Sequence, residues 1–313
     1  MKPSKDVERA ALLAFIALVL IGGGNGVAIR FSNRELSPFW GAGLRFAGAS
    51  LFFFALVVLG HHALPRGRAL AGAVLFGLLS FGASFAFIYW GLLKVQAGLA
   101  QVILATVPLL TLLLAILQSQ ERFRLNRLVG GVVAIAGIVL IFAERTRGSG
   151  PAALSLLAIM AAALCIAEGT VVVKAFPRLP VTTMNAVAMA TGAAFLFAVS
   201  LGAHESWRLP QHASTWAALI YLVALGSAAV FTLYLFVLRR WAASAAAFQF
   251  VLFPIATLLL SSWLDREPIT ITLLAGGLLV LVGVYVGALA GVAPRVRAIN
   301  VPHSISKTGG REH

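Results

Sequence analysis

The sequence predicts an all-α membrane protein with ten transmembrane helices, arranged as two inverted five-helix repeats. Three observations lead to this fold class. The 313-residue chain is 60% hydrophobic and only 11% charged, whereas soluble domains are about 45–50% apolar. It contains ten long apolar runs. A segment of its first half also recurs in the second half, 146 positions later and without a gap.

The apolar runs have the length of transmembrane helices. About 20 residues are needed to cross a hydrocarbon layer of roughly 30 Å at about 1.5 Å per residue. Lipid offers the backbone no hydrogen-bond partner, so runs this long and evenly apolar must be helices, because barrel strands are shorter and alternate. The predicted spans cover residues 10–30, 38–60, 69–92, 95–118, 126–143, 151–173, 181–203, 213–238, 242–264 and 269–291.

Charged residues separate these spans. The first run follows Lys2, Lys5 and Arg9, as a signal peptide also would. It lacks an A-x-A-like cleavage site and is about 20 residues long, so we interpret it as a transmembrane helix. Each of the other nine runs begins within a few residues of a cation, and in chain order these cations are Arg34, Arg68, Lys94, Arg124, Arg147, Arg178, Arg208, Arg240 and Arg266.

The distribution of cations orients the predicted helices. Ten spans place both termini on one side of the membrane. That side carries 16 Lys and Arg residues, the opposite side carries seven, and Arg45 lies inside the second span. Because short cytoplasmic loops are enriched in cations, we expect residues 1–9 and a flexible tail at 294–313 to be cytoplasmic. The net charge of +14 is then explained by membrane topology, and no nucleic-acid partner is expected.

The repeated segment divides the chain. PLLTLLLAILQSQE at 108–121 matches PIATLLLSSWLDRE at 254–267. At the same offset Pro108 aligns with Pro254, and Gly137 aligns with Gly283. Any two apolar helices share leucines, but a gapless match of Pro, Glu and Gly is specific. We therefore predict a first repeat at 10–144 and a second repeat at 151–293.

Each predicted repeat contains five spans. Because five is odd, the second copy enters the membrane from the opposite side. Inverted pairs of this kind surround a substrate site near the bilayer midplane in known transporter folds. Two near-equivalent halves can also give inward-open and outward-open states of similar energy. The repeat therefore predicts alternating access.

Several motifs carry a resemblance to a known family. ERFRLNRLVGGVVAIAGIVLI after the fourth span, REPITITLLAGGLLVLVGVYV after the ninth, LRF at 44–46 and GNGVAIR at 24–30 resemble the EamA permeases of the drug/metabolite transporter superfamily. The resemblance covers about residues 10–291. It implies a ten-helix carrier in a bacterial-type inner membrane, usually an exporter of amino acids or other small metabolites, with aromatic amino-acid exporters among its members.

One position departs from the family pattern. Where the family usually has bulky aromatic residues around the asparagine of the first span, this sequence has Gly22 and Gly26. The glycines either widen a cavity or allow close helix packing through a G-x-x-x-G motif. We favour packing.

Two prolines are candidate hinges. Pro108 and Pro254 lie near the centres of their spans, where each removes a backbone donor and frees the carbonyl four residues earlier. An unpaired carbonyl at this depth is costly unless it faces protein or a wet cavity. We expect both proline faces to point inward, either as moving hinges or as static kinks.

Two charged side chains lie within the predicted spans. Placing the Glu168 side chain within a membrane span costs roughly 3 kcal/mol of free energy. Ionisable side chains inside a membrane are functional candidates by default. Glu168 would bind a substrate ammonium group or carry a proton, or it would pair structurally near Lys174. Arg45 would bind a substrate carboxylate, or its side chain would reach the headgroups. A direct Arg45–Glu168 pair is not expected, because their depths differ by about 10 Å.

Neutral polar and aromatic residues complete the predicted substrate site. Gln101 lies two helical turns before Pro108 and shares its face, and aromatic rings can stack on a flat or cationic substrate. A membrane-interface position is the alternative for the tryptophan, and hydrogen bonding between helices is the alternative for the amides. The candidates are Asn25, Tyr89, Trp90, Gln101, Tyr234 and Gln249.

Other classes of chemistry find little support in the sequence. Cys165 is the sole cysteine, no histidine occurs in an H-E-x-x-H motif, and no phosphate-binding G-x-x-x-x-G-K-[ST] motif is present, so no catalytic residue, metal or cofactor is expected. We predict a secondary-active or facilitative exporter of amino acids or related metabolites, with aromatic amino acids or flat organic cations as candidate substrates. A monomer or weak homodimer is expected. The alternatives are a membrane-embedded enzyme and a scaffold subunit that binds a partner through a glycine stripe at Gly283, Gly287 and Gly291.

Overall fold

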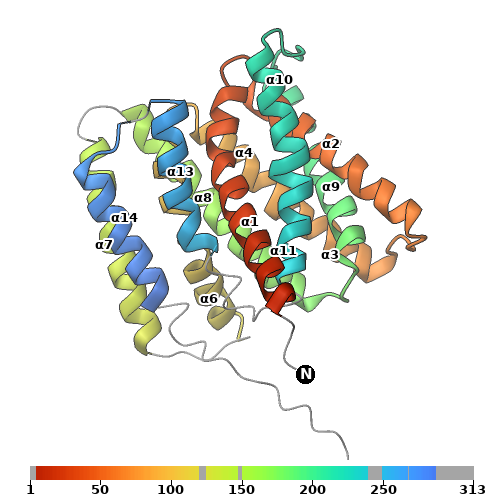
Figure 1. The fold of residues 1–313 in the computed structure, drawn as a ribbon, viewed down its shortest axis with the longest axis horizontal. Coiled ribbons are helices and arrows are strands. Elements are labelled where there is room, and N and C mark those ends of the chain that lie inside the picture. Colours follow the sequence, from red (N-terminus) through yellow and green to blue (C-terminus); the bar gives the residue numbers. More distant parts are fainter. Residues whose placement is uncertain (1–4, 120–124, 147–149, 239–248, 267, 287–313) are drawn as a thin grey trace, which may run out of the picture.

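A computed structural model of the chain describes residues 5–119, 125–146, 150–238, 249–266 and 268–286. All regular secondary structure within these ranges is helical, as predicted (Figure 1). The predicted tail at 294–313, the start of the ninth span at 242–248 and the end of the tenth span lie outside the described residues.

The first repeat contains five successive helical segments. They are α1 (Lys5–Ser32), α2 (Pro38–Leu59), a third segment made of α3 (Gly67–Gly77), the π-helix η1 (Leu78–Ala83) and α4 (Ser84–Gly91), a fourth made of α5 (Ala97–Leu104) and α6 (Val107–Leu117), and α7 (Leu125–Thr146).

The second repeat follows the same order. Its segments are α8 (Gly150–Val172) with the short 3₁₀ helix η2 (Val173–Ala175), α9 (Val181–Gly202), the segment of α10 (Ala213–Ile220), the π-helix η3 (Tyr221–Ala229) and α11 (Val230–Leu238), then α13 (Gln249–Leu264) and α14 (Ile271–Val284). Among the described residues, seven segments have the length and apolar composition of membrane spans. Three shorter apolar helices at Val129–Leu140, Leu252–Leu264 and Ile271–Val284 fall within the remaining predicted spans.

Helix packing follows the repeat. The second segments of the two repeats, α2 and α9, pack on each other, and so do the fifth segments, α7 and α14 (Figure 1). The first segment of one repeat packs on the fourth segment of the other, because α1 contacts α13 and α8 contacts α6. This reciprocal set of contacts is what a twofold relation between the repeats produces.

Both third segments contain a π-helix at matching positions. α3 begins at Gly67 and α10 begins at Ala213, which is an offset of 146, and η1 and η3 both end 16 residues after these starts. A π-helix inside an α-helical segment is rare and occurs frequently at functional sites. The ends of the two π-helices therefore lie at equivalent positions of the two repeats.

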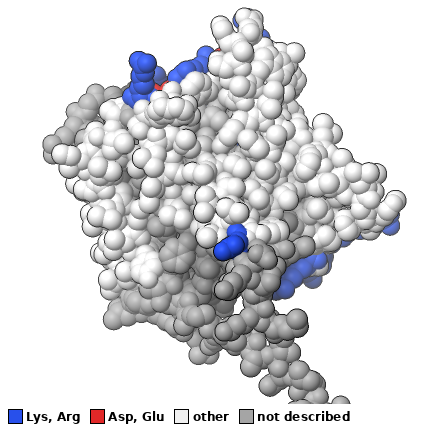
Figure 2. All heavy atoms as spheres, viewed as in Figure 1, with Lys and Arg blue, Asp and Glu red and all other residues white. Residues whose placement is uncertain are grey.

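The outer surface is suited to lipid. Many large apolar side chains are exposed, including Leu51, Val58, Leu157 and Leu259. On the face shown in Figure 2, blue spheres lie towards the upper and lower ends of the described part, red shows only at the upper end, and a broad white region lies between. A wide band of exposed apolar side chains favours the bilayer as the environment of this surface.

Acidic side chains cap helices at the end where α1 finishes. Glu205 accepts hydrogen bonds from the backbone amides of Phe39 (3.2 Å) and Trp40 (2.9 Å) at the start of α2. Glu35 accepts hydrogen bonds from the amides of Gln211 and His212, directly before α10. A carboxylate is stabilising there because it satisfies free amides and faces the positive end of the helix dipole. Each repeat thus supplies a carboxylate that caps a helix of the other.

The cap at Glu35 leads to a prediction about pH. Desolvation alone would raise the pKa of Glu35, but hydrogen bonds from the Thr215 side chain and from the amides of Gln211 and His212 bring it below its ordinary value of 4.5. A lowered pKa in the folded state adds stability that is present above the ordinary pKa and is lost as the pH falls below it. We therefore expect Glu35→Gln to lower the melting temperature at neutral pH and to have little effect in acid.

The measurement is thermal unfolding of detergent-purified wild type and Glu35→Gln across a pH series. The difference in melting temperature between the two proteins should shrink as the pH falls. A difference that stays constant from neutral pH to about pH 3 would contradict a cap that depends on the ionised carboxylate.

Candidate substrate cavity

A cavity of about 310 Å³ lies between the two repeats. We name it the Arg45 cavity. Its walls come from α1, α2, the third segments of both repeats, α8 and α13, so each repeat contributes to it. The lining residues are Gly22, Asn25, Arg45, Phe76, Ser80, Phe81, Phe85, Ile166, Thr170, Gly226, Val230, Phe231, Tyr234, Gln249 and Phe253.

A smaller chamber of about 140 Å³ adjoins the Arg45 cavity. The two spaces share Gly22, Asn25, Phe85, Ile166 and Phe253 in their walls. The small chamber adds Gln101 of α5 and the residues around the break between α5 and α6. Together the two spaces bring five of the predicted site residues to one place, namely Asn25, Arg45, Gln101, Tyr234 and Gln249.

Arg45 is held in the protein interior. Its residue is only 1% exposed, so its side chain does not extend to the headgroups, which was the alternative interpretation. Its Nε donates to Ser227 Oγ (3.0 Å), and its Nη2 donates to the carbonyl oxygen of Gly226 (3.0 Å). The guanidinium carbon also lies 4.9 Å from the ring centre of Phe85 and 5.1 Å from that of Phe46. Hydrogen bonds and cation–π contacts therefore fix the orientation of the guanidinium.

The π-helix η3 supplies the partners of Arg45. The carbonyl oxygen of Gly226 accepts from Arg45 and also from Asn25 Nδ2 (3.2 Å). A Cβ at position 226 would lie 2.1 Å from Asn25 Oδ1, so a larger residue there would displace the amide group of Asn25. The equivalent π-helix η1 contributes Ser80 and Phe81 to the opposite wall. The two matched π-helices thus both face the same cavity.

Aromatic rings form the apolar part of the wall. The ring centre of Phe81 lies 5.5 Å from that of Phe231, across the two repeats, and 5.3 Å from that of Phe46. Phe85 packs edge-on against Phe46 at 4.6 Å. Rings at these distances pack favourably and give a rigid apolar surface. The cavity combines this surface with a fixed positive charge.

Four buried polar atoms in or beside the Arg45 cavity have no hydrogen-bond partner among the described residues. They are Asn25 Oδ1, Arg45 Nη1, Ser80 Oγ and Tyr89 Oη. The Tyr89 hydroxyl lies beside the guanidinium of Arg45 and interacts with it electrostatically. Buried polar groups in native proteins are nearly always satisfied, so a cluster of exceptions calls for an explanation. A bound molecule would provide one.

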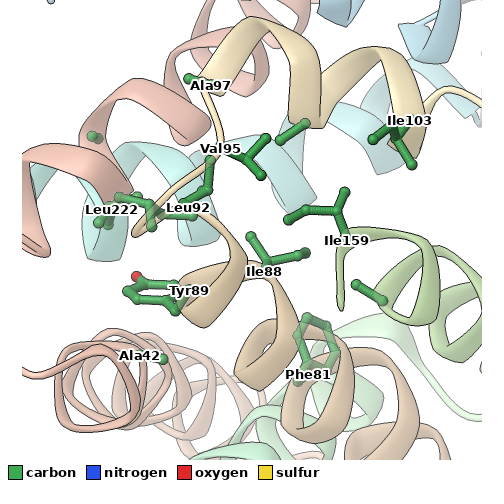
Figure 3. Packing of buried hydrophobic residues seen from close by; sticks show 14 of the residues in the cluster. Ala42, Phe81, Ile88, Tyr89, Leu92, Val95, Ala97, Ile103, Ile159 and Leu222 are labelled. Carbon is green, nitrogen blue, oxygen red and sulfur yellow. The ribbon is translucent and has the colours of Figure 1, made fainter. Parts of the chain in front are cut away.

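Tyr89 and Trp90 point to different environments although they are neighbours. Tyr89 is fully buried, and Figure 3 shows its ring with Ala42 on one side and Leu222 on the other. Trp90 is 38% exposed and lines a separate apolar groove of about 590 Å³ together with Phe39, Phe87 and Leu157. That groove is larger than the Arg45 cavity, but its lining is apolar, and several of its side chains are exposed on the outer surface. The structure therefore places Tyr89 beside the Arg45 cavity and Trp90 away from it.

Glu168 is not among the residues that line the Arg45 cavity. Its carboxylate accepts two hydrogen bonds from Gln118 Nε2, at 2.8 and 3.0 Å. Gln118 directly follows α6, so this contact joins the end of the fourth segment to α8. Glu168 and Arg45 are not brought together as a pair, in line with the expectation from their depths.

The two prolines occupy different structural contexts. The fourth segment is interrupted at Ala105 and Thr106, and Pro108 is the second residue of α6. Pro254 lies inside the continuous helix α13. The predicted freed carbonyl at Leu104 belongs to a residue that lines the small chamber, as an inward-facing proline region requires. The equivalence seen in the sequence therefore does not extend to the local backbone.

The glycines of the first span serve close packing. A Cβ at Gly22 would lie 2.5 Å from the Phe253 ring, and one at Gly26 would lie 3.3 Å from Ala97 Cβ. Both glycines also border the small chamber. The packing interpretation agrees with these distances.

Sequence reasoning missed the residues that complete the site. Ser80, Phe81, Phe85, Gly226 and Ser227 line the cavity or orient Arg45. They lie in uniformly apolar segments, and the sequence pattern of a π-helix does not differ from that of an α-helix. At the repeat offset of 146, Ser80 aligns with Gly226 and Phe85 aligns with Phe231. This alignment is the feature of the sequence that could have pointed to these residues.

The fold and the cavity define a class of protein, the polytopic membrane transporters built from two repeats around a shared hollow. The family comparison agrees with this class. The chain belongs to the EamA-like transporter family, whose profile matches it twice, at residues 9–143 and 153–288. It is therefore a multi-span membrane protein of a family that moves small molecules across lipid bilayers.

Individual relatives have the same general description. An uncharacterized transporter of Archaeoglobus fulgidus is 26% identical over 83% of this chain and 91% of the relative. The uncharacterized inner membrane transporter YedA of Escherichia coli is 29% identical over 87% and 89% of the two chains. A probable terminal-alkyne amino-acid exporter of Streptantibioticus cattleyicolor is 28% identical over 68% and 72%.

A solved crystal structure has the same fold. It superposes with a TM-score of 0.64 at 19% identity and covers 90% of this chain and 97% of its own. At this level of identity the likeness concerns the fold alone.

Proposed function

We propose that this protein is a secondary-active or facilitative exporter of amino acids or related small metabolites, located in a bacterial-type inner membrane and working by alternating access. The observation that carries the proposal is the Arg45 cavity, a polar and aromatic hollow lined by both repeats. A buried charge in a membrane protein is a functional candidate by default. Both termini would be cytoplasmic, as the cation distribution predicts.

The comparisons support transport, and one of them supports export of amino acids. The family is a transporter family, and one relative is named a probable exporter of an unusual amino acid. The aromatic wall of the cavity adds a physical reason to favour substrates with an aromatic or other apolar side chain.

Within the described residues, the two ends of the molecule differ in a way that suits one state of an alternating cycle. At the end where α1 finishes, Asp265 bonds both Arg30 and Arg34, and Arg30 Nη1 also donates to the carbonyl oxygen of Val95 (2.9 Å). These contacts join α1, α13 and the loop before α5. The Arg45 cavity instead reaches towards Tyr234, near the opposite end of its segment. We infer that the ion-paired end is the closed gate of this conformation.

The test is uptake and counterflow of labelled L-phenylalanine in proteoliposomes containing the purified protein. We expect the protein to accelerate exchange across the membrane, and Arg45→Lys to reduce the rate at least tenfold, because lysine cannot reproduce the two directed hydrogen bonds of the guanidinium. Thr191→Ala on α9, outside the cavity, serves as the control that retains activity. If the protein binds amino acids but moves none of them in either direction, the carrier proposal fails.

A membrane-embedded enzyme remains the second candidate class from the sequence. No cluster of three or more His, Cys, Asp or Glu side chains suited to a metal occurs within the described residues. The family and its named relatives are transporters. Neither finding favours catalysis, so transport is the function we put forward.

A further inference from the structure

The Arg45 cavity has an unbalanced charge. Arg45 is the lone cationic side chain among the described residues that line it, and none of these lining residues carries a carboxylate. Glu168, the acid that the sequence places within a predicted span, accepts hydrogen bonds from Gln118 in another part of the structure. A charge removed from water requires a partner of opposite sign, and the protein supplies none here within its described part.

Three of the four unpartnered atoms can donate a hydrogen bond. Arg45 Nη1 carries two N–H groups and no acceptor, while the hydroxyls of Ser80 and Tyr89 can each donate one hydrogen bond. Asn25 Oδ1 is the one pure acceptor among the four atoms. A donor-rich set around a fixed guanidinium matches the oxygens of a carboxylate.

The apolar walls indicate what the carboxylate is attached to. Phe81, Phe85 and Phe231 surround the polar cluster from both repeats, and Phe253 continues the surface into the small chamber. Rings arranged in this way accept a flat or branched apolar group. The same positive charge disfavours a cationic head group, which separates the two substrate types that the sequence alone left open.

We propose that the Arg45 cavity recognises the carboxylate of a small aromatic or other apolar organic acid, and that a substrate ammonium group is not required for binding. This inference rests on the proposed function, since it names the substrate class of the same site. Arg45 binds the carboxylate, the Ser80 hydroxyl donates to it, and the phenylalanine rings hold the apolar body. The Tyr89 hydroxyl lies behind this site, against the guanidinium of Arg45. Asn25 Oδ1 accepts a hydrogen bond from an amino or hydroxyl group where the substrate has one.

Three probes with the same ring and different charges test the inference. They are 3-phenylpropionate, L-phenylalanine and phenethylamine, added to detergent-purified full-length protein, with binding measured by calorimetry and by the rise in melting temperature. We expect 3-phenylpropionate and L-phenylalanine to bind and phenethylamine to bind at least tenfold more weakly. Equal or tighter binding of phenethylamine, or binding of none of the three, overturns the inference.

Variants locate the binding to the cavity. Ser80→Ala removes one donor without touching Arg45, and we expect it to weaken 3-phenylpropionate binding severalfold. Arg45→Gln should abolish binding. Glu168→Gln, outside the cavity, is the matched control and should leave the affinity unchanged. If Arg45→Gln does not fold, Ser80→Ala and the charge series in the wild type still decide the question.

Failure of this inference and failure of the carrier proposal give different results. A protein that moves phenethylamine or another cation in proteoliposomes, but binds no carboxylate, remains a carrier with a different substrate class. A protein that binds 3-phenylpropionate through Arg45 but moves nothing retains the binding site and is not a carrier.

Discussion

Gly283→Ala should strongly destabilise the folded protein, although it adds a single methyl group. The new Cβ would lie 2.4 Å from the backbone nitrogen of Ala134 and 2.5 Å from the carbonyl oxygen of Gly130. Both atoms belong to the backbone of α7, so neither can move aside without shifting the helix. We expect a loss of at least about 1–3 kcal/mol in the free energy of unfolding, the range for overpacked sites.

The physical basis is the close approach of α7 and α14. The contact is reciprocal, because a Cβ at Gly137 would lie 2.6 Å from the carbonyl oxygen of Gly276. Helices in lipid gain stability from close packing through small residues, since lipid tails provide no hydrophobic drive for association. These are the two glycines that the repeat in the sequence places at equivalent positions.

Gly277→Ala on the same helix is the matched control. Its Cβ would meet Val102 Cγ2 at 3.4 Å, an ordinary contact distance. Alanine also favours the helix over glycine, so we expect this variant to be neutral or slightly more stable. Thermal unfolding in detergent compares the two. If both variants melt at the wild-type temperature, the close contact between α7 and α14 does not exist as described.

Asp265→Asn should produce the second large effect. The Asp265 side chain is only 4% exposed and bonds Arg30 Nε at 2.7 Å as well as Arg34. Asparagine keeps the shape but removes the charge that holds two guanidinium groups together. We expect a loss of about 1.5–3 kcal/mol, the range for hydrogen bonds to charged groups. The larger values found for fully buried pairs do not apply, because both arginines reach solvent.

The same variant should also change transport if the ion-paired end is a gate. Loss of the contact weakens the closed arrangement, so flux in proteoliposomes should change together with stability. Glu168→Gln provides the comparison, because its carboxylate bonds a neutral amide in an exposed position and its removal should cost well under about 1 kcal/mol. An Asp265→Asn protein with wild-type melting temperature and wild-type flux would exclude both the structural and the gating role.

In the part of the chain that the structure describes, the two ends of the molecule are chemically unequal despite the repeat. At the offset of 146, Asp265 corresponds to Ser119, so the contact between α6 and α8 has no matching acid at that position. Gln118 and Glu168 form a hydrogen bond with one charged partner there. This inequality gives a physical reason for one end to be held closed more strongly than the other.

The sequence by itself determined the all-helical, multi-span architecture and its repeat. Lipid forces the backbone of a long apolar run into a helix, so the ends of α2, α9 and the segment of α10 to α11 agree with the predicted spans to within a residue. The recurrence of Pro, Glu and Gly at one offset predicted which helices are equivalent. These signals are local or periodic, and a sequence displays them directly.

Only the tertiary structure decided which polar residues share a cavity. The sequence treated Glu168 and Arg45 alike as charged residues in a span, but the rotation of each helix turned Arg45 inward and Glu168 towards Gln118. The sequence also gave no sign of the π-helices that provide Gly226 and Ser80, because the π-helical and α-helical stretches of these segments have the same apolar composition. The orientation of a side chain around a helix is set by packing against neighbours far away in the chain, and no local pattern in a uniformly apolar span records it.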